Sequence, residues 1–314
     1  MSDLTVEVKA LARAQGAHLV GVASIDRFKG APRGHHPLDL LPSARSVVVI
    51  AHRFFQSVLD CDRFGVESEL IPKEELWDVQ QTVFDFMYNT ANMRLQMIAC
   101  QMAAYLEDHG YASLPLPAGG YRIGAGRYAF FSHRHAAVAA GLGEFGLNNL
   151  ILTPQYGPRV RLESMITSAE LVPDPLCEGP ICLGENACGL CLESSECFGE
   201  IHELEVAGKT MQLARFTGGC LTDHQCKRRN RNGALPHIRY CWGVCPVGGA
   251  FEVAGGPGRV AVATDSPKTW PRPERRRSYH VGSVGGDAAH RTPCLHARLG
   301  LDCAYTRGLG ILDL

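Results

Sequence analysis

The stretch from Cys182 to Cys245 decides how the rest of this chain is interpreted. It reads CLGENACGLCLESSEC over 182–197, CLTDHQC over 220–226 and CWGVCP over 241–246, and it holds eight of the chain's 13 cysteines. A Cys-x2-Cys pair and a Cys-Pro ending are typical of cubane iron–sulfur sites, and in two-cluster ferredoxins the cysteine before proline binds the other cluster. The spacing therefore predicts a two-cluster, ferredoxin-like module within a larger protein.

Three other interpretations of these cysteines stay open. A disulfide framework usually belongs to a short secreted chain, whereas this chain has 314 residues and shows no secretory signal pattern. Structural zinc usually takes two Cys-x2-Cys knuckles or Cys/His pairs, and only Cys188 and Cys191 form such a knuckle. Unrelated free thiols are the third alternative. The pattern favours iron–sulfur clusters over all three.

Composition narrows the class of protein. The formal net charge of −1 gives no electrostatic reason to expect nucleic acid or an anionic membrane as a partner. No apolar run reaches the roughly 18 residues that a bilayer span needs. The N-terminal segment has neither an apolar signal core nor a twin-arginine pair, so we expect a cytoplasmic protein. Many cysteines in that compartment favour metal binding over disulfides.

Hydrophobic periodicity predicts an α/β core ahead of the cysteines. The expected helices are 4–15, 73–109 and 133–140, and the expected strands are 17–23, 46–51, 150–153 and 159–167. After Gly248 the periodicity weakens and the chain is typical of an extended tail. We therefore expect a cofactor-binding core over 1–172, the ferredoxin-like module over 173–256 and a C-terminal tail over 257–314.

The longest expected helix carries apolar residues at the spacing of a packing face. Cys100 lies on the same helix, and we expect it to be a buried free thiol. The apolar residues of the face are Trp77, Phe84, Met87, Leu95, Ile98, Met102 and Leu106.

The order of several short pieces resembles the corrinoid iron–sulfur reductases, the group that includes epoxyqueuosine reductases and reductive dehalogenases. No single piece is diagnostic, and the resemblance covers residues 4–250 piece by piece. The pieces are GAHLVGVA at 16–23, LPSARSVVVIA at 41–51, AGLGEFG at 140–146 with Asn148, TPQYGPRVRL at 153–162, DPL at 174–176 and CPVG at 245–248.

This resemblance implies a nitroreductase-like core that holds cobalamin base-off, with two 4Fe–4S clusters nearby. The glycine segment and the turn after it become predicted cofactor contacts: Gly141, Gly143, Gly146, Asn148, Thr153, Gly157 and Arg159. Cross-ligation of the two-cluster type assigns Cys182, Cys188, Cys191 and Cys245 to the first cluster, and Cys197, Cys220, Cys226 and Cys241 to the second.

The chain also departs from the family's pattern. Phe198 follows Cys197 where the family usually has proline, and Ile238 stands where a cysteine is usual, so Cys226 has to substitute as a ligand. The aspartate proton donor of epoxyqueuosine reductases is missing from the stretch GRYAFFSHRH at 126–135. The chain therefore resembles the group without matching either of its characterised branches.

A reductive step needs a proton source, and the candidates lie just before the glycine segment. Tyr128, His133 and His135 can donate a proton, and Arg127 can stabilise a developing anion. In the alternative interpretation, the two histidines only cap or flank the helix that starts there.

The sequence as a whole predicts a cobalamin-dependent iron–sulfur oxidoreductase. Its reaction is expected to be a dehalogenation-like or deoxygenation-like step on a small organic substrate. The electrons are expected from an external donor such as a ferredoxin or flavodoxin. Two alternatives stay open: a cobalamin-free electron-transfer protein that feeds a partner enzyme, and a protein that reduces or handles corrinoids.

Overall fold

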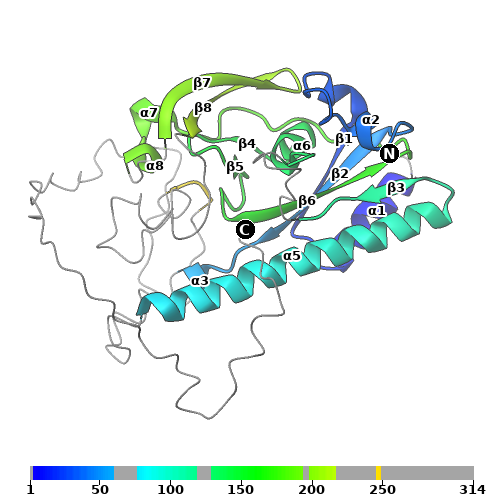
Figure 1. Cartoon of the computed structure of the whole chain (residues 1–314), viewed down its shortest axis with the longest axis horizontal. Helices are drawn as coiled ribbons and strands as arrows, with labels where there is room; N and C mark the ends of the chain where they lie inside the picture. The colour runs from blue at the N-terminus through cyan, green and yellow to red at the C-terminus, as the bar shows by residue number, and fades with distance from the viewer. Residues whose placement is uncertain (1–2, 60–75, 119–128, 194–197, 217–244, 249–314) are drawn as a thin grey trace, which may run out of the picture. The chain divides into compact units, whose positions relative to one another are not determined.

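The computed structural model describes residues 3–59, 76–118, 129–193, 198–216 and 245–248 (Figure 1). The chain divides into two compact units, Met1–Val262 and Ala263–Leu314, and every described residue belongs to the first. This unit is a mixed α/β fold, as the periodicity predicted, with helices and antiparallel strands.

A four-stranded antiparallel sheet lies at the centre of the described structure, with the strand order β1-β2-β6-β3. The residues of β2 are buried along both of its faces as far as Ala51 and His52, because other elements cover both sides of the sheet. This explains why the strand reads as a continuous apolar run instead of an alternating one. The strands are β1 Leu19–Ser24, β2 Ser46–Arg53, β3 Ser113–Pro115 and β6 Val160–Thr167.

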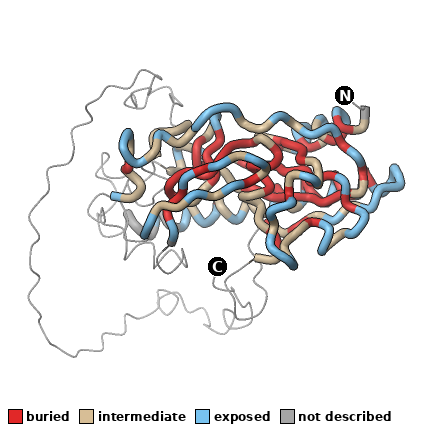
Figure 2. Tube along the Cα trace, turned by 90° about the horizontal axis from the view of Figure 1, so that it is seen from above, coloured by how far each residue is buried: buried red, intermediate tan, exposed pale blue. Residues whose placement is uncertain are grey.

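Two helices, α1 (Asp3–Ala14) and α5 (Leu76–Asp108), cover one face of this sheet (Figure 1). Between them and the sheet lies one hydrophobic cluster. Its contributors include Val8 of α1 and Leu95 and Met102 of α5, all fully buried. Figure 2 shows how buried residues run through the middle of the described structure.

A layer of smaller elements covers the opposite face of the sheet, and a second hydrophobic cluster lies beneath them. The close approach of this layer requires glycine at position 21, because a Cβ there would lie 2.5 Å from the carbonyl oxygen of Ala140. The elements are α6 His133–Ala139, the strand pair β4 Glu144–Phe145 and β5 Ile151–Leu152, and the hairpin of β7 Phe198–Val206 and β8 Lys209–Phe216.

Short elements complete the fold: η1 Ile25–Phe28, α2 Pro37–Leu40, α3 Gln56–Leu59, α7 Gly184–Ala187 and α8 Leu190–Glu193. Among the helices of the described ranges, none combines the length and the apolarity needed to cross a membrane.

The expected helices and strands ahead of the cysteines are confirmed within two residues, except that residues 73–75 of the longest expected helix lie outside the described residues. On α5, the packing face is confirmed where the structure describes it, since Met87, Leu95, Ile98, Met102 and Leu106 are buried. Phe84 is half-buried, and the side chain of Trp77 lies outside the described residues. The prediction for Cys100 was wrong, because its side chain is exposed. The buried face passes through Ile98 and Met102, which turns Cys100 away from the sheet.

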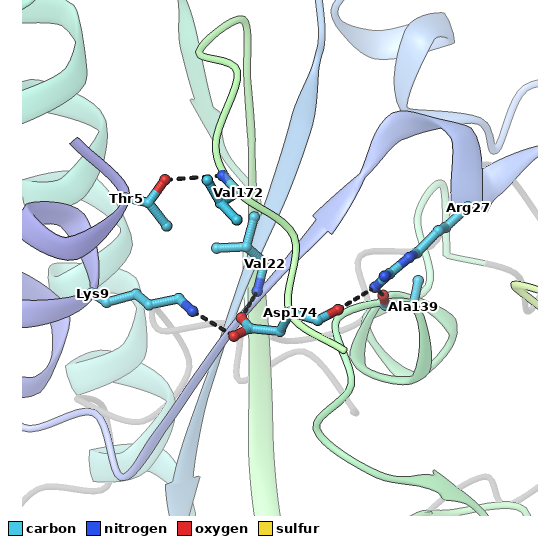
Figure 3. A network of polar contacts seen from close by, with 7 residues as sticks. All are labelled: Thr5, Lys9, Val22, Arg27, Ala139, Val172 and Asp174. Carbon is cyan, nitrogen blue, oxygen red and sulfur yellow. Dashed lines mark hydrogen bonds and ion pairs between the residues drawn. The ribbon is translucent and has the colours of Figure 1, made fainter. Parts of the chain in front are cut away.

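Asp174 fastens the segment after β6 to both β1 and α1 (Figure 3). One carboxylate oxygen accepts a hydrogen bond from the backbone N–H of Val22 at 2.8 Å, and the other pairs with the Lys9 ammonium at 2.5 Å. Arg27 donates to the backbone oxygens of Asp174 and Ala139, both at 2.7 Å. The start of the segment that leads to the cysteines is therefore fixed to the core.

Asp174→Ala should lower the free energy of unfolding by about 3 kcal/mol, because it leaves a largely buried ammonium and a backbone N–H without their acceptor. Urea unfolding followed by circular dichroism measures this. Asp26→Ala is the matched control: Asp26 pairs with Lys29, but the two side chains are 75% and 80% exposed, so the variant should stay close to wild type. Equal losses in both variants would contradict the role given to Asp174.

Candidate cysteine-lined site

Four cysteines from two distant parts of the chain line one pocket. Cys182, Cys188 and Cys191 come from the segment around α7 and α8, and Cys245 comes from 245–248. Gly146 and Asn148 of the glycine segment line the same pocket. These are the four cysteines predicted to hold the first cluster. The structure therefore brings that predicted set together at one place.

Tight turns present the first three cysteines. The helix α7 is a single turn followed directly by Cys188, whose N–H donates to the carbonyl of Gly184 at 3.0 Å. Gly184 and Gly189 both have positive φ, at 77° and 64°, a conformation that glycine adopts without a Cβ penalty. The chain can therefore reverse twice within a short segment and point several thiols into one pocket.

Cys245 is held by an interlocking contact with the turn before β6. A Cβ on Gly157 would lie 2.0 Å from the carbonyl oxygen of Val247, and a Cβ on Gly248 would lie 2.1 Å from the backbone nitrogen of Gly157. The buried Arg159 guanidinium donates to the carbonyl of Cys245 at 3.0 Å and to that of Val247. Arg159, predicted to contact a cofactor, thus positions the segment that carries Cys245.

The other predicted cofactor contacts also meet protein atoms. A Cβ on Gly141 would lie 2.0 Å from the carbonyl oxygen of Pro175, and one on Gly143 would lie 2.2 Å from that of Leu152. Thr153 is fully buried and bonds with the turn at Gly157. Gly141 and Gly143, both predicted to contact a cofactor, are therefore required by the close packing of the chain itself.

Burial makes the thiols of this pocket hard to ionise on their own. It raises the pKa of Cys191 to about 12 and that of Cys245 to about 11, and it also raises the pKa of Cys188. The other thiolates around the pocket act in the same direction on all three. Each thiol must lose its proton to bind a metal, and coordination to the metal then stabilises the thiolate. This donor set fits an iron–sulfur cluster.

Within the described part of the chain, no three His, Cys, Asp or Glu side chains form a group that could hold a metal ion. A cubane cluster makes a different demand, because each of its four cysteine ligands binds a separate iron atom. The absence of a single-ion group among the described residues therefore does not bear on a cluster site.

Two charged residues that the sequence did not single out also lie at this site. The buried carboxylate of Glu144 on β4 contacts the segment leading to Cys182, and Lys209 of β8 pairs with it. Lys209 follows Ala207 and Gly208, which both have positive φ and form the tight turn of the β7–β8 hairpin. The alternating residues on both sides of Gly208 were the available signal for this hairpin.

The two predicted histidine proton donors lie on the first turn of α6. The Nε2 of His133 lies 2.8 Å from the carbonyl of Pro117, and its Nδ1 lies 2.9 Å from the hydroxyl of Ser164. His135 contacts the hydroxyl of Ser132 through Nδ1 at 2.6 Å. Burial lowers the pKa of both imidazoles to about 4. They are neutral near pH 7, which favours the alternative that they flank the helix.

The remaining predicted site residues lie outside the described residues. They are the second cluster's cysteines and two of the acid–base candidates: Cys197, Cys220, Cys226, Cys241, Arg127 and Tyr128.

A buried carboxyl group lies on the sheet face beneath α5. The side chain of Glu163 on β6 is 1% exposed, and its Oε2 has no hydrogen-bond partner among the described residues. Burial raises the pKa of Glu163 to about 8, against the opposing effect of the nearby Arg161. Arg161 itself donates to Asn92 of α5 and to the carbonyl of Ala118. Glu163 is therefore mostly protonated at neutral pH.

This buried carboxyl predicts a pH-dependent stability. Since folding raises the pKa of Glu163 from 4.5 to about 8, the stability it contributes is fully present below pH 4.5 and is lost as the pH rises through 8. Glu163→Gln should reduce the loss of unfolding free energy between pH 5 and pH 8 by about 3 kcal/mol. Urea unfolding at both pH values measures it. Parallel pH profiles for variant and wild type would contradict the prediction.

Comparisons with known proteins find similarity to reductive dehalogenases and to epoxyqueuosine reductases, the two groups that the sequence pieces resemble. Over 38 residues, the chain is 53% identical to tetrachloroethene reductive dehalogenases of Desulfitobacterium hafniense and Dehalobacter restrictus. This match covers 12% of the chain and 7% of each relative, so the chain matches only a small part of these proteins. No protein-family model matches the chain.

Solved structures of the same two groups are also similar. An epoxyqueuosine reductase from Streptococcus thermophilus is 15% identical, with a TM-score of 0.45 over 78% of this chain and 66% of that one. An epoxyqueuosine reductase solved with a tRNA stem loop is 20% identical, with a TM-score of 0.37 over 62% and 52%. A catabolic reductive dehalogenase solved with 3-bromo-4-hydroxybenzoic acid is 20% identical, with a TM-score of 0.45 over 68% and 29%.

Proposed function

We propose that this protein is an iron–sulfur oxidoreductase whose first 4Fe–4S cluster is held by Cys182, Cys188, Cys191 and Cys245. The observation that carries the proposal is that these four cysteines line one pocket although they come from distant parts of the chain. When bound, such a cluster supplies one-electron transfer. Arg159 and the glycine pair 157 and 248 hold the fourth ligand in place.

The second cluster and the domain division belong to the same proposal. Cys197, Cys220, Cys226 and Cys241 are its proposed ligands, within a ferredoxin-like module over 173–256 that follows a nitroreductase-like core. The electrons are proposed to come from a small external donor such as a ferredoxin or flavodoxin.

The substrate step is proposed to be a reduction of a small organic molecule with bound cobalamin. It is supported by the resemblance and by the short match to reductive dehalogenases. Gly141 and Gly143 face backbone carbonyl groups of the protein, so the proposal of cobalamin rests on the resemblance. Tyr128, the neighbour of Arg127 in the sequence, is the proposed proton donor. His133 and His135 suit this role less well, because both are neutral and already contact other hydrogen-bonding groups of the protein.

Anaerobic reconstitution with iron, sulfide and cobalamin tests the proposal, followed by metal analysis and EPR of the reduced protein. About eight irons per chain and a base-off cobalt signal are expected for two clusters and a corrinoid. Eight irons without retained cobalamin would make the protein an electron carrier. Zinc without iron would overturn the proposal. A screen of the loaded protein includes halogenated aromatics and a tRNA stem loop, since similar proteins were solved with each.

A further inference from the structure

The Glu144 carboxylate binds the backbone of a proposed cluster ligand. Glu144 lies on β4, and its side chain is 4% exposed. Its Oε1 accepts a hydrogen bond from the backbone N–H of Cys182 at 2.8 Å and another from the N–H of Ile181. A buried carboxylate of the core thus holds the chain at the residue whose thiol lines the pocket.

Lys209 completes this arrangement from the other side of the cysteine segment. Its ammonium lies 2.8 Å from the Oε2 of Glu144 and donates to the carbonyls of Cys177 and Gly179, at 2.9 and 3.0 Å. The hairpin that carries Lys209 is itself attached to the core, since the N–H of Ala214 donates to the carbonyl of Leu147 at 3.0 Å. The segment 177–182 is therefore bound at its N–H groups by the anion and at its carbonyls by the cation.

A buried ion pair is a poor source of stability, because removing two charges from water costs about as much as their attraction returns. The pair can act here in two other ways, through the position of the backbone that it binds and through the charges that it carries. Partners of the ligands in a metal site orient those ligands. The net charge close to an iron–sulfur cluster helps to set its reduction potential.

We propose that Glu144 and Lys209 are a positioning pair that fixes Cys182 at the cluster and balances the charge beside it. The inference rests on the proposed function, because Cys182 has to be a ligand of the cluster. Glu144 supplies one negative charge next to Cys182, and Lys209 offsets it with one positive charge. Neither residue touches the reacting atoms.

The test uses the reconstituted full-length protein and the variants Glu144→Gln, Lys209→Met and the double variant. Glu144→Gln removes a negative charge near the cluster and should raise its midpoint potential. Lys209→Met should lower the potential, and the double variant should return it close to the wild-type value. Glu144→Ala also loses the acceptor, so it should release iron to a chelator roughly tenfold faster than wild type.

Glu205→Gln is the matched control, because it removes a negative charge from an exposed position of the same hairpin. It should leave the potential and the rate of iron release unchanged. Thermal unfolding of each variant shows whether it has folded, and Lys209→Met, which acts on a half-buried surface residue, keeps the test valid if Glu144→Ala does not fold.

The outcomes separate this inference from the proposed function. A wild-type protein that retains no iron overturns both. A wild-type protein that retains iron, together with variants that match its potential and its iron release, overturns the positioning pair alone. Shifts of the same sign in both single variants also overturn it, because a general loosening of the site acts in one direction. Opposite shifts that cancel in the double variant support it.

Discussion

Cys191→Ser should remove about four irons from each reconstituted chain, because serine leaves one iron of the proposed first cluster without its thiolate. Cys191 lies on α8 and lines the pocket together with Cys182, Cys188 and Cys245. The effect should be as large for Cys245→Ser, although 54 positions separate the two residues (245 − 191 = 54). Iron analysis and the visible absorbance of the cluster measure the loss.

Cys100→Ser is the matched control for both variants. Its thiol is exposed on α5, so the variant should retain the iron content of the wild-type protein. Equal iron contents in Cys191→Ser and Cys100→Ser would exclude the pocket as a cluster site. A loss in Cys191→Ser without a loss in Cys245→Ser would remove the fourth ligand from the proposal.

Gly157→Ala should lower the free energy of unfolding by about 4 kcal/mol or more, and it should also reduce the iron retained. The new Cβ would lie 2.0 Å from the carbonyl oxygen of Val247, at a residue whose φ is +54°. The backbone around 245–248 has to move away from the turn, which carries Cys245 away from the pocket. A cost of this size is expected for a clash against backbone at a strained position. Urea unfolding and iron analysis measure the two effects.

Gly34→Ala separates the clash from the backbone strain. Gly34 has a φ of +84°, but no atom lies within 4 Å of a Cβ placed there. It should cost only about 1 kcal/mol, the penalty of an L-residue in the left-handed region. Similar losses for the two variants would mean that the contact between Gly157 and Val247 contributes little.

The sequence predicted the parts of the fold that local patterns determine. The apolar run of β2 and the spacing along α5 were sufficient to predict these two elements. A strand that is buried on both faces is apolar throughout, and a helix that is buried on one face has apolar residues at helical spacing. Cys100 was placed wrongly because only its presence on the helix was considered: it lies two positions from both Ile98 and Met102, about 200° around the helix from the packing face.

The site was predictable where its chemistry is concentrated in one residue type. The resemblance grouped Cys182, Cys188, Cys191 and Cys245 as one ligand set, and the structure places all four around one pocket. Glu144 and Lys209 could not be found from the positions of the cysteines. The two residues are 65 positions apart in the sequence (209 − 144 = 65), and they pair only because the β7–β8 hairpin folds back over the core. The glycines were noticed, but the carbonyl groups that face them are remote in sequence.

The interlocked turn at Gly157 and Gly248 makes the position of Cys245 depend on the folded core. We expect Cys245 to reach the pocket only after β6 and its preceding turn have formed, since Arg159 and Gly157 provide the surface on which its segment lies. We therefore expect the polypeptide to fold first and to bind the proposed cluster afterwards, in contrast to zinc fingers, where the metal drives folding. Cooperative unfolding of the iron-free chain would show this order, and an iron-free chain without cooperative unfolding would refute it.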